Sequence, residues 1–213
     1  MILRFKLLET TASISDKILS ALLEDMVPVF QNISVYAQKN IREVVREGIQ
    51  NSREYGSIMS GQLRLELGIP NSSQALENIL SVWDQVIVSY NKPRISNKRI
   101  KGSIYLSMIR ADYSDVLSVD LAQVLTAKSQ SLPWLEWLLL MGDKVIIRDY
   151  SVSFESSPFS RTGGAVMRSS VNGRWSVPSE FAGVKNNNWI TRTIESLEPN
   201  IDQALFRAME QAV

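Results

Sequence analysis

The chain has neither histidine nor cysteine among its 213 residues. Without cysteine, disulfide frameworks and thiolate metal sites are excluded. Without histidine, a nucleophilic triad lacks the base that normally works near neutral pH. The phosphate-binding patterns GxxxxGK[ST] and GxGxxG are also missing. The sequence therefore predicts a protein that is not an enzyme, with no catalytic residues, no metal site and no cofactor.

Excess charge and long apolar runs are scarce as well. The chain carries 23 Lys and Arg against 22 Asp and Glu, a net charge of +1, so no global field attracts nucleic acid or membranes. The longest apolar run, Leu138–Met141, is too short to span a bilayer, and we expect no membrane partner. With 45% apolar residues, the composition is typical of a globular protein.

Helical periodicity dominates the two ends of the chain. Apolar residues recur at steps of three and four over residues 14–49, and Ser13 or Ser15 is the expected N-cap. Pro28 predicts a kink or a break in this long helix. A helix starting near Asn188 closes the chain. Its expected buried face consists of Ile190, Ile194, Leu197, Ile201, Leu205, Ala208 and Ala212.

The middle of the chain changes period. Helices are expected at about 54–67, ended by Gly68, and at 73–82, capped by Ser72. Alternation then predicts strands at 85–90 and 101–110, which form a hairpin. A helical insert follows at about 112–142. Further strands are expected at 144–155 and from Gly164, within or beside a long loop at about 156–188.

Together these elements predict a single α+β domain over residues 1–213. In this fold, the long N-terminal helix and the C-terminal helix pack on a small antiparallel sheet. The helical insert and the long loop are additions to this arrangement.

One cluster of positive charge stands out. It lies at the expected hairpin tip and contains no acid. Its members are Lys92, Arg94, Lys98, Arg99 and Lys101. Several Lys and Arg contacts give sequence-independent binding to phosphates, so the cluster is a candidate surface for DNA or an acidic partner. The alternative is a solvated turn whose positive charge discourages edge pairing. A ring of subunits would favour DNA contact through multivalency.

The loop at 156–188 is too long for an ordinary connection and is rich in aromatic residues and arginine. That composition is typical of protein interfaces. The candidate subunit-interface residues are Phe159, Arg161, Arg168, Arg174, Trp175, Phe181 and Trp189. The alternative is that Trp175 and Phe181 fold back over the domain's own core. The segment Ser160–Gly164, SRTGG, could hold a phosphate but is more typical of a turn.

Paired carboxylates are the chemistry that histidine-free chains can still use, as in glycoside hydrolysis. Asp143 with Asp149 and Glu24 with Asp25 are possible pairs, without distinguishing context. A small cell-wall hydrolase is therefore an alternative of another class, as is a generic protein-binding module.

Three segments resemble virion proteins of tailed phages. The segment Met59–Pro70, MSGQLRLELGIP, is similar to a small-Gly-x-Leu segment of neck and tail-completion proteins. The block Ser131–Val152 resembles structural proteins of contractile-tailed, T4-like phages, especially those of cyanobacteria. The stretch Phe181–Ile201 resembles the loop that leads into the closing helix of that class.

This resemblance implies a non-enzymatic virion structural protein of the neck or head–tail connector. Such a subunit assembles into a ring in the host cytoplasm and completes the tail at the head–tail junction. Its implied partners are copies of itself, other neck, portal-adjacent or tail proteins, and packaged DNA in the channel. The alternative station is a tail terminator or sheath-associated protein. The insert at 112–142 departs from the smaller members, which leaves ring size open.

Overall fold

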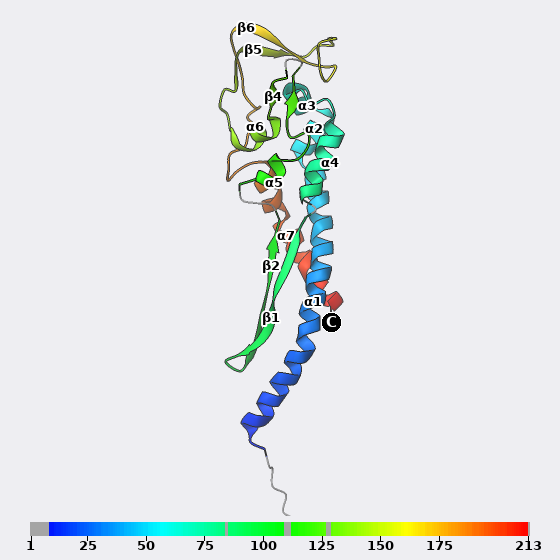
Figure 1. The fold of residues 1–213 in the computed structure, drawn as a ribbon, viewed down its shortest axis with the longest axis vertical. Helices are drawn as coiled ribbons and strands as arrows, with labels where there is room; N and C mark the ends of the chain where they lie inside the picture. The colour runs from blue at the N-terminus through cyan, green and yellow to red at the C-terminus, as the bar shows by residue number, and fades with distance from the viewer. Residues whose placement is uncertain (1–8, 84, 109–111, 127–128, 213) are drawn as a thin grey trace, which may run out of the picture. The chain divides into compact units, whose positions relative to one another are not determined.

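The computed structural model describes residues 9–83, 85–108, 112–126 and 129–212, which form a mixed α+β structure (Figure 1). These residues fall into two compact units. The first contains the chain up to Ile41, the segment Val86–Ser107 and the chain from Asp202. The second contains Arg42–Gln85 and Met108–Ile201. The α+β fold class is confirmed, and the number of independent domains stays a prediction.

Helix α1 spans Thr11–Gln50 without interruption, so the expected break at Pro28 does not occur. Proline removes one backbone hydrogen bond from a helix. The expected serine caps are wrong, because the Thr10 hydroxyl accepts the backbone N–H of Ser13 at 3.2 Å and the helix starts earlier. Threonine satisfies this unpaired donor as serine would.

Helix α7 spans Trp189–Ala212, and Ile190, Ala208 and Ala212 of its predicted face are buried. The other predicted positions are half-buried, and Ala204, outside the predicted set, is buried. Helix α7 packs with α1. Within the first unit, the Asn40 side chain donates to the Ala204 carbonyl. Within the second, Gly48 lies so close to Leu197 that a Cβ on the glycine would come within 2.3 Å of it. The packing of the first and last helices is as predicted.

Strands β1 (Ile87–Ser96) and β2 (Arg99–Ser107) form the predicted hairpin, which lies in the first unit. Strand β1 runs further and β2 begins earlier than the sequence predicts, because the register continues to the pair Ser96–Arg99. The register shifts between Asn91 and Arg94, beside Pro93. Proline has no N–H to donate, and a bulge is one of the few places where a strand accepts it.

Three helices begin the second unit: α2 (Arg53–Ser60), α3 (Gln62–Leu67) and α4 (Ser72–Trp83). The predicted single helix over 54–67 is divided at Gly61, whose backbone is extended. Gly68 ends α3 in the left-handed conformation (φ 66°), as predicted. Ser72 does not cap α4. It lies inside the helix, and its hydroxyl donates to the Met59 carbonyl.

The insert holds two short helices, α5 (Ser114–Leu117) and α6 (Trp134–Leu140). It also holds two short paired strands that periodicity did not predict, β3 (Val124–Leu125) and β4 (Ser131–Leu132). The apolar stripe of α6 is fully buried. It consists of Trp134, Leu135, Leu138 and Leu139.

The strand expected from Gly164 is present as β6 (Val166–Trp175), which lies within the predicted loop at 156–188 and pairs antiparallel with β5 (Ile147–Ser153). The strand occupies ten residues of that range, so the expected loop is shorter than 156–188. The described chain thus has three separate two-stranded sheets in place of one small sheet.

Candidate functional site

The five predicted cations of the β1–β2 hairpin are all solvent-exposed. The register pairs Arg94 with Lys101 and Ser96 with Arg99. Directly paired residues project from the same face of an antiparallel pair, so Arg94, Arg99 and Lys101 share one face. Further along that face come Asn91, Ser103 and Tyr105, and the Asn91 amide donates to the Tyr105 hydroxyl at 3.0 Å. This polar and basic surface is called the outer face below.

The opposite face of the hairpin packs within the first unit. Gly102 lies against the Phe30 ring of α1, and a Cβ on this glycine would come within 2.4 Å of the ring. Pro93 and Val88 are buried. Because strand side chains alternate between faces, burying one side fixes the cations of the outer face toward solvent.

The hairpin tip brings the remaining cations into place. Asn97 and Lys98 both have positive φ, 51° and 58°, as a two-residue type I′ turn requires. Lys98 therefore stands at the apex beside Arg99, and Lys92 lies at the bulge on β1. The structure thus groups all five predicted cations along one hairpin.

These cations lie in an acid-free stretch of sequence and form no ion pair in the described structure. Residues 85–111 contain no Asp or Glu. Elsewhere, cations form ion pairs, such as Arg46 with Glu77 and Arg192 with Glu54, both at 2.7 Å. Among the described residues, no ion pair involves a cation of the hairpin. Its positive charge is therefore not neutralised by neighbours.

The seven interface candidates separate into two groups. Trp175, Phe181 and Trp189 are buried, which agrees with the alternative that such aromatics cover the chain's own core. Phe159 is 87% exposed, and Arg161, Arg168 and Arg174 are exposed too. Arg168 forms an ion pair with Glu155. Composition alone does not separate the two groups, because the type of a residue does not determine whether its side chain is buried.

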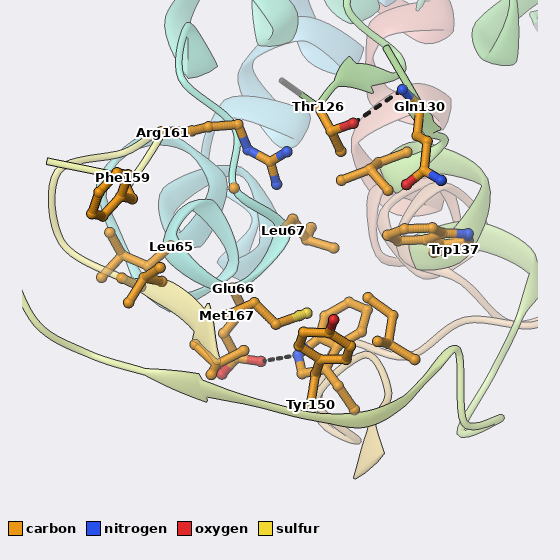
Figure 2. A pocket seen from close by; sticks show the side chains of 17 residues that line it. Leu65, Glu66, Leu67, Thr126, Gln130, Trp137, Tyr150, Phe159, Arg161 and Met167 are labelled. Carbon is orange, nitrogen blue, oxygen red and sulfur yellow. Dashed lines mark hydrogen bonds between the residues drawn. The ribbon is translucent and has the colours of Figure 1, made fainter. Parts of the chain in front are cut away.

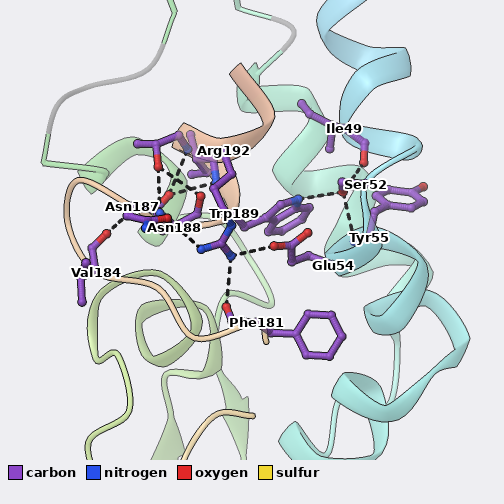
Figure 3. A network of polar contacts seen from close by, with 12 residues as sticks. Ile49, Ser52, Glu54, Tyr55, Phe181, Val184, Asn187, Asn188, Trp189 and Arg192 are labelled. Atoms are coloured by element: carbon purple, nitrogen blue, oxygen red, sulfur yellow. Dashed lines mark hydrogen bonds and ion pairs between the residues drawn. The ribbon is translucent and has the colours of Figure 1, made fainter. Parts of the chain in front are cut away.

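Trp189 and its neighbours belong to a polar network at the start of α7 (Figure 3). Asn188 is fully buried and caps the helix, accepting the backbone N–H of Ile190 at 2.9 Å. The Trp189 indole donates to the Ser52 hydroxyl at 2.8 Å, and Arg192 pairs with Glu54. Buried groups satisfied in this way fix the geometry of a core. The network is structural, and it joins α7 to the start of α2.

A pocket lies elsewhere in the second unit (Figure 2). Its walls come from the end of α3, from Thr126, Gln130 and Leu132, from α6, and from the β5–β6 pair with its connection. Its volume is about 430 Å³. The Trp137 and Trp175 rings meet edge to face, 5.8 Å apart. Arg161 and Phe159 are the two interface candidates that line this pocket from the β5–β6 connection.

The SRTGG segment forms a turn closed on itself. The Ser160 hydroxyl accepts the backbone N–H groups of Thr162 and Ala165, each at 3.3 Å, and donates to the Ala165 carbonyl. Two amides that could have faced a phosphate are therefore used within the turn. The expectation of a turn is confirmed, and its consequence is that Arg161 is held in place.

The carboxylate pairs gain no support from their surroundings. Glu24, Asp25, Asp143 and Asp149 are exposed, and none of them lines the pocket. Among the described residues, no cluster of three or more acidic side chains could hold a metal ion.

One helix passes a test for membrane spans by length and composition. The most apolar 18-residue window of α1 has a mean hydropathy of 1.2 and is 11% buried. This differs from the expectation based on continuous apolar runs. A single helix of this kind is weak evidence for a span.

The chain was also compared with known proteins. Neither the protein-family models nor the curated proteins nor the solved structures gave a match.

Proposed function

We propose that this protein is a non-catalytic assembly protein whose β1–β2 hairpin contacts the phosphate backbone of DNA. The observation that carries the proposal is the outer face of the hairpin. It presents exposed cations without ion pairs in a stretch of sequence that has no acid. Lys and Arg contacts to phosphates release counterions and need no particular base sequence.

The apex of the hairpin supports this reading over a simple solvated turn. A type I′ turn prefers glycine at its second central residue, because positive φ strains other side chains. Here that residue is Lys98, with φ 58°. A residue that violates the local preference marks a site where function outweighs stability. Solubility alone does not require the lysine to stand at the strained position.

The arrangement of the cations on the outer face favours a polyanion over a single acidic group. Arg94, Arg99 and Lys101 lie along one face, so they follow a line of charge. Successive phosphates of a nucleic acid provide such a line, and several weak contacts to it add up. A single chain binds weakly through five cations, whereas a ring multiplies the contacts.

The biological setting that we propose is the neck of a tailed-phage virion, at the head–tail junction. The resemblance of Met59–Pro70, Ser131–Val152 and Phe181–Ile201 to neck and tail-completion proteins supports it. In this setting, copies of the chain form a ring whose hairpins face packaged DNA. A tail terminator or sheath-associated station is the alternative, and a pull-down with portal-proximal and tail proteins would separate the two.

Charge reversal tests DNA contact directly. In the full-length chain, Lys98→Glu, Arg99→Glu and Lys101→Glu together should weaken binding to a labelled duplex of about 20 base pairs by 100-fold or more, because attraction becomes repulsion. Fluorescence anisotropy at fixed low salt measures the affinity. Circular dichroism checks that the fold is kept.

The β5–β6 pair offers a matched control. Arg148, Arg168 and Arg174 are exposed, and replacing them with Glu changes the net charge by the same amount. We expect this variant to keep its DNA affinity within about threefold. Equal losses in the two variants would mean that net charge matters and the hairpin does not.

Ring formation has its own test. Mass photometry over a range of concentrations should show a closed species, because cyclic assemblies have a defined number of copies. A species of about six or twelve copies would support the neck. A monomer at all concentrations would remove the multivalency argument. The anisotropy measurement would then be the test of DNA contact by the hairpin.

A further inference from the structure

The pocket of the second unit has the size and chemistry of a ligand site. Its volume of about 430 Å³ falls within the usual range for small-molecule sites, which is about 300–1,000 Å³. The lining is mainly apolar and includes the paired rings of Trp137 and Trp175. Phe159 stands at the rim, with 87% of its surface exposed. Large exposed aromatics are costly to leave in water and are enriched where proteins bind partners.

A positive charge without an acceptor faces this apolar space. Figure 2 shows the Arg161 side chain extending from the β5–β6 connection, with its guanidinium directed inward between Leu65 and Thr126. Within the described part of the chain, no hydrogen bond or ion pair involves Arg161. Partial burial lowers the pKa of Arg161, although arginine remains charged. Its donors are available to an anion.

Among the described residues of the lining, the one acid is already engaged. Glu66 accepts the Trp175 indole N–H at 3.0 Å and, through its other oxygen, the Gln62 amide. Thr126 likewise accepts the backbone N–H of Gln130 at 3.0 Å. These contacts tie the pocket walls to one another. Among the described residues of the lining, Arg161 is therefore the charged side chain that has no protein partner.

The backbone around Arg161 is built to hold it there. Gly68 ends α3 in the left-handed conformation, and a Cβ at this position would come within 2.5 Å of an Arg161 nitrogen. The missing side chain thus makes room for the guanidinium. On the other side, the Ser160 turn fixes the loop next to Arg161. Preorganised receptors of this kind lose less entropy when they bind.

We propose that this pocket binds an apolar carboxylate. Arg161 receives the carboxylate through two parallel N–H donors, and the Trp137 and Trp175 rings contact the apolar body. The planar guanidinium suits this bidentate geometry. The proposal is independent of DNA binding, since every residue it uses lies in the second unit. The carboxylate belongs either to a free small molecule or to the end of a peptide chain.

The test uses the ¹⁵N-labelled full-length chain and follows the indole N–H signals of its five tryptophans by NMR. The probes are 4-phenylbutyrate and its neutral amide, 4-phenylbutyramide. We expect saturable shifts of the Trp137 and Trp175 signals. The carboxylate should bind about tenfold or more tightly than the amide, because only the anion forms charge-assisted hydrogen bonds.

Two variants assign the preference to Arg161. Arg161→Gln should bind the acid and the amide with equal affinity. Arg174→Gln, an exposed arginine outside the pocket, should keep the preference. The indole spectrum without ligand checks folding. If Arg161→Gln is misfolded, Arg161→Lys replaces it, and a reduced preference is expected because lysine lacks the planar fork.

Peptide probes then distinguish the two sources of the carboxylate. N-acetyl-Ala-Phe with a free C-terminus should outbind phenylbutyrate if the ligand is a chain end, and should bind more weakly if it is a free small molecule. The proposal is overturned if acid and amide bind equally to the unmodified chain, or if Arg161→Gln keeps the preference. Absence of indole shifts up to about 10 mM probe would overturn it too.

Discussion

The two long hairpins of this protein use the same local structure in opposite ways. In β1–β2, a two-residue turn closes strands whose outer face is polar and basic, and residues 85–111 contain no acid. In β5–β6, a long connection carries Arg161 and Phe159, and the strands wall a pocket. Arginine occurs in both. What differs is where its charge is directed: toward solvent on one hairpin, and toward an apolar cavity on the other.

This difference shows that the number of charges says little by itself. The β5–β6 pair also carries several exposed arginines, but Glu155 forms an ion pair with Arg168, and Asp149 follows Arg148 on β5. The β1–β2 hairpin carries no compensating acid. Interactions of exposed charges are screened within about 10 Å at moderate salt, so only local composition decides whether a polyanion is attracted.

The largest effect on stability is expected for a buried residue of the β5–β6 hairpin, in comparison with an exposed residue of β1–β2. Trp175 of β6 is 6% exposed and donates to Glu66. Trp175→Ala should lower the free energy of unfolding by about 3–5 kcal/mol, the usual cost of removing a buried aromatic. Tyr105→Ala, on the outer face of β2 and 53% exposed, should cost less than about 1 kcal/mol. Denaturant titration of both variants measures the difference. Similar losses of stability in the two variants would contradict the distinction between a buried β6 residue and an exposed β2 residue.

A moderate effect is expected where β2 meets α1. A methyl group at Gly102 would lie 2.4 Å from the Phe30 ring, so Gly102→Ala must displace that ring. We expect a loss of about 1–3 kcal/mol, as for other overpacked sites. Phe30→Leu should recover part of it in the double variant. Additive losses in a double-mutant cycle would show that the two residues do not touch.

The smallest effect is at the apex of β1–β2. Lys98→Gly relieves the strain of positive φ but makes the unfolded chain more flexible, so stability should rise by only about 0.5 kcal/mol. DNA affinity should fall at the same time, since one phosphate contact is lost. Thermal melts and anisotropy titrations of one preparation check both signs. A variant that gains stability with unchanged affinity would reduce Lys98 to an ordinary turn residue.

Periodicity predicted the elements whose pattern is long and regular. The faces of α1 and α7 are clear over many turns, and the β1–β2 alternation is bounded by polar turn residues. It also placed the five cations together. The exact caps could not be predicted, because Thr10, Ser13 and Ser15 are equally suitable donors and acceptors by type.

The rest of the site depends on contacts far apart in sequence. The sequence predicts a strand from Gly164, but its continuation to Trp175 follows from its pairing with β5. For that reason Trp175, which is buried, resembled Phe159, which is exposed. The pocket joins residues from 65 to 175, and no local pattern connects Gly68 with Arg161. The empty space that the glycine leaves is visible only in the folded chain.

The most direct test of the account is the salt dependence of duplex binding by the unmodified chain and by Lys98→Gln, Arg99→Gln, Lys101→Gln. A plot of log affinity against log salt concentration has a slope of about −0.9 for each phosphate contact. We predict a slope of about −4 for the unmodified chain and a reduction in magnitude of nearly 3 for the triple variant. The same slope in both proteins would place the DNA contacts elsewhere and contradict the role of the hairpin.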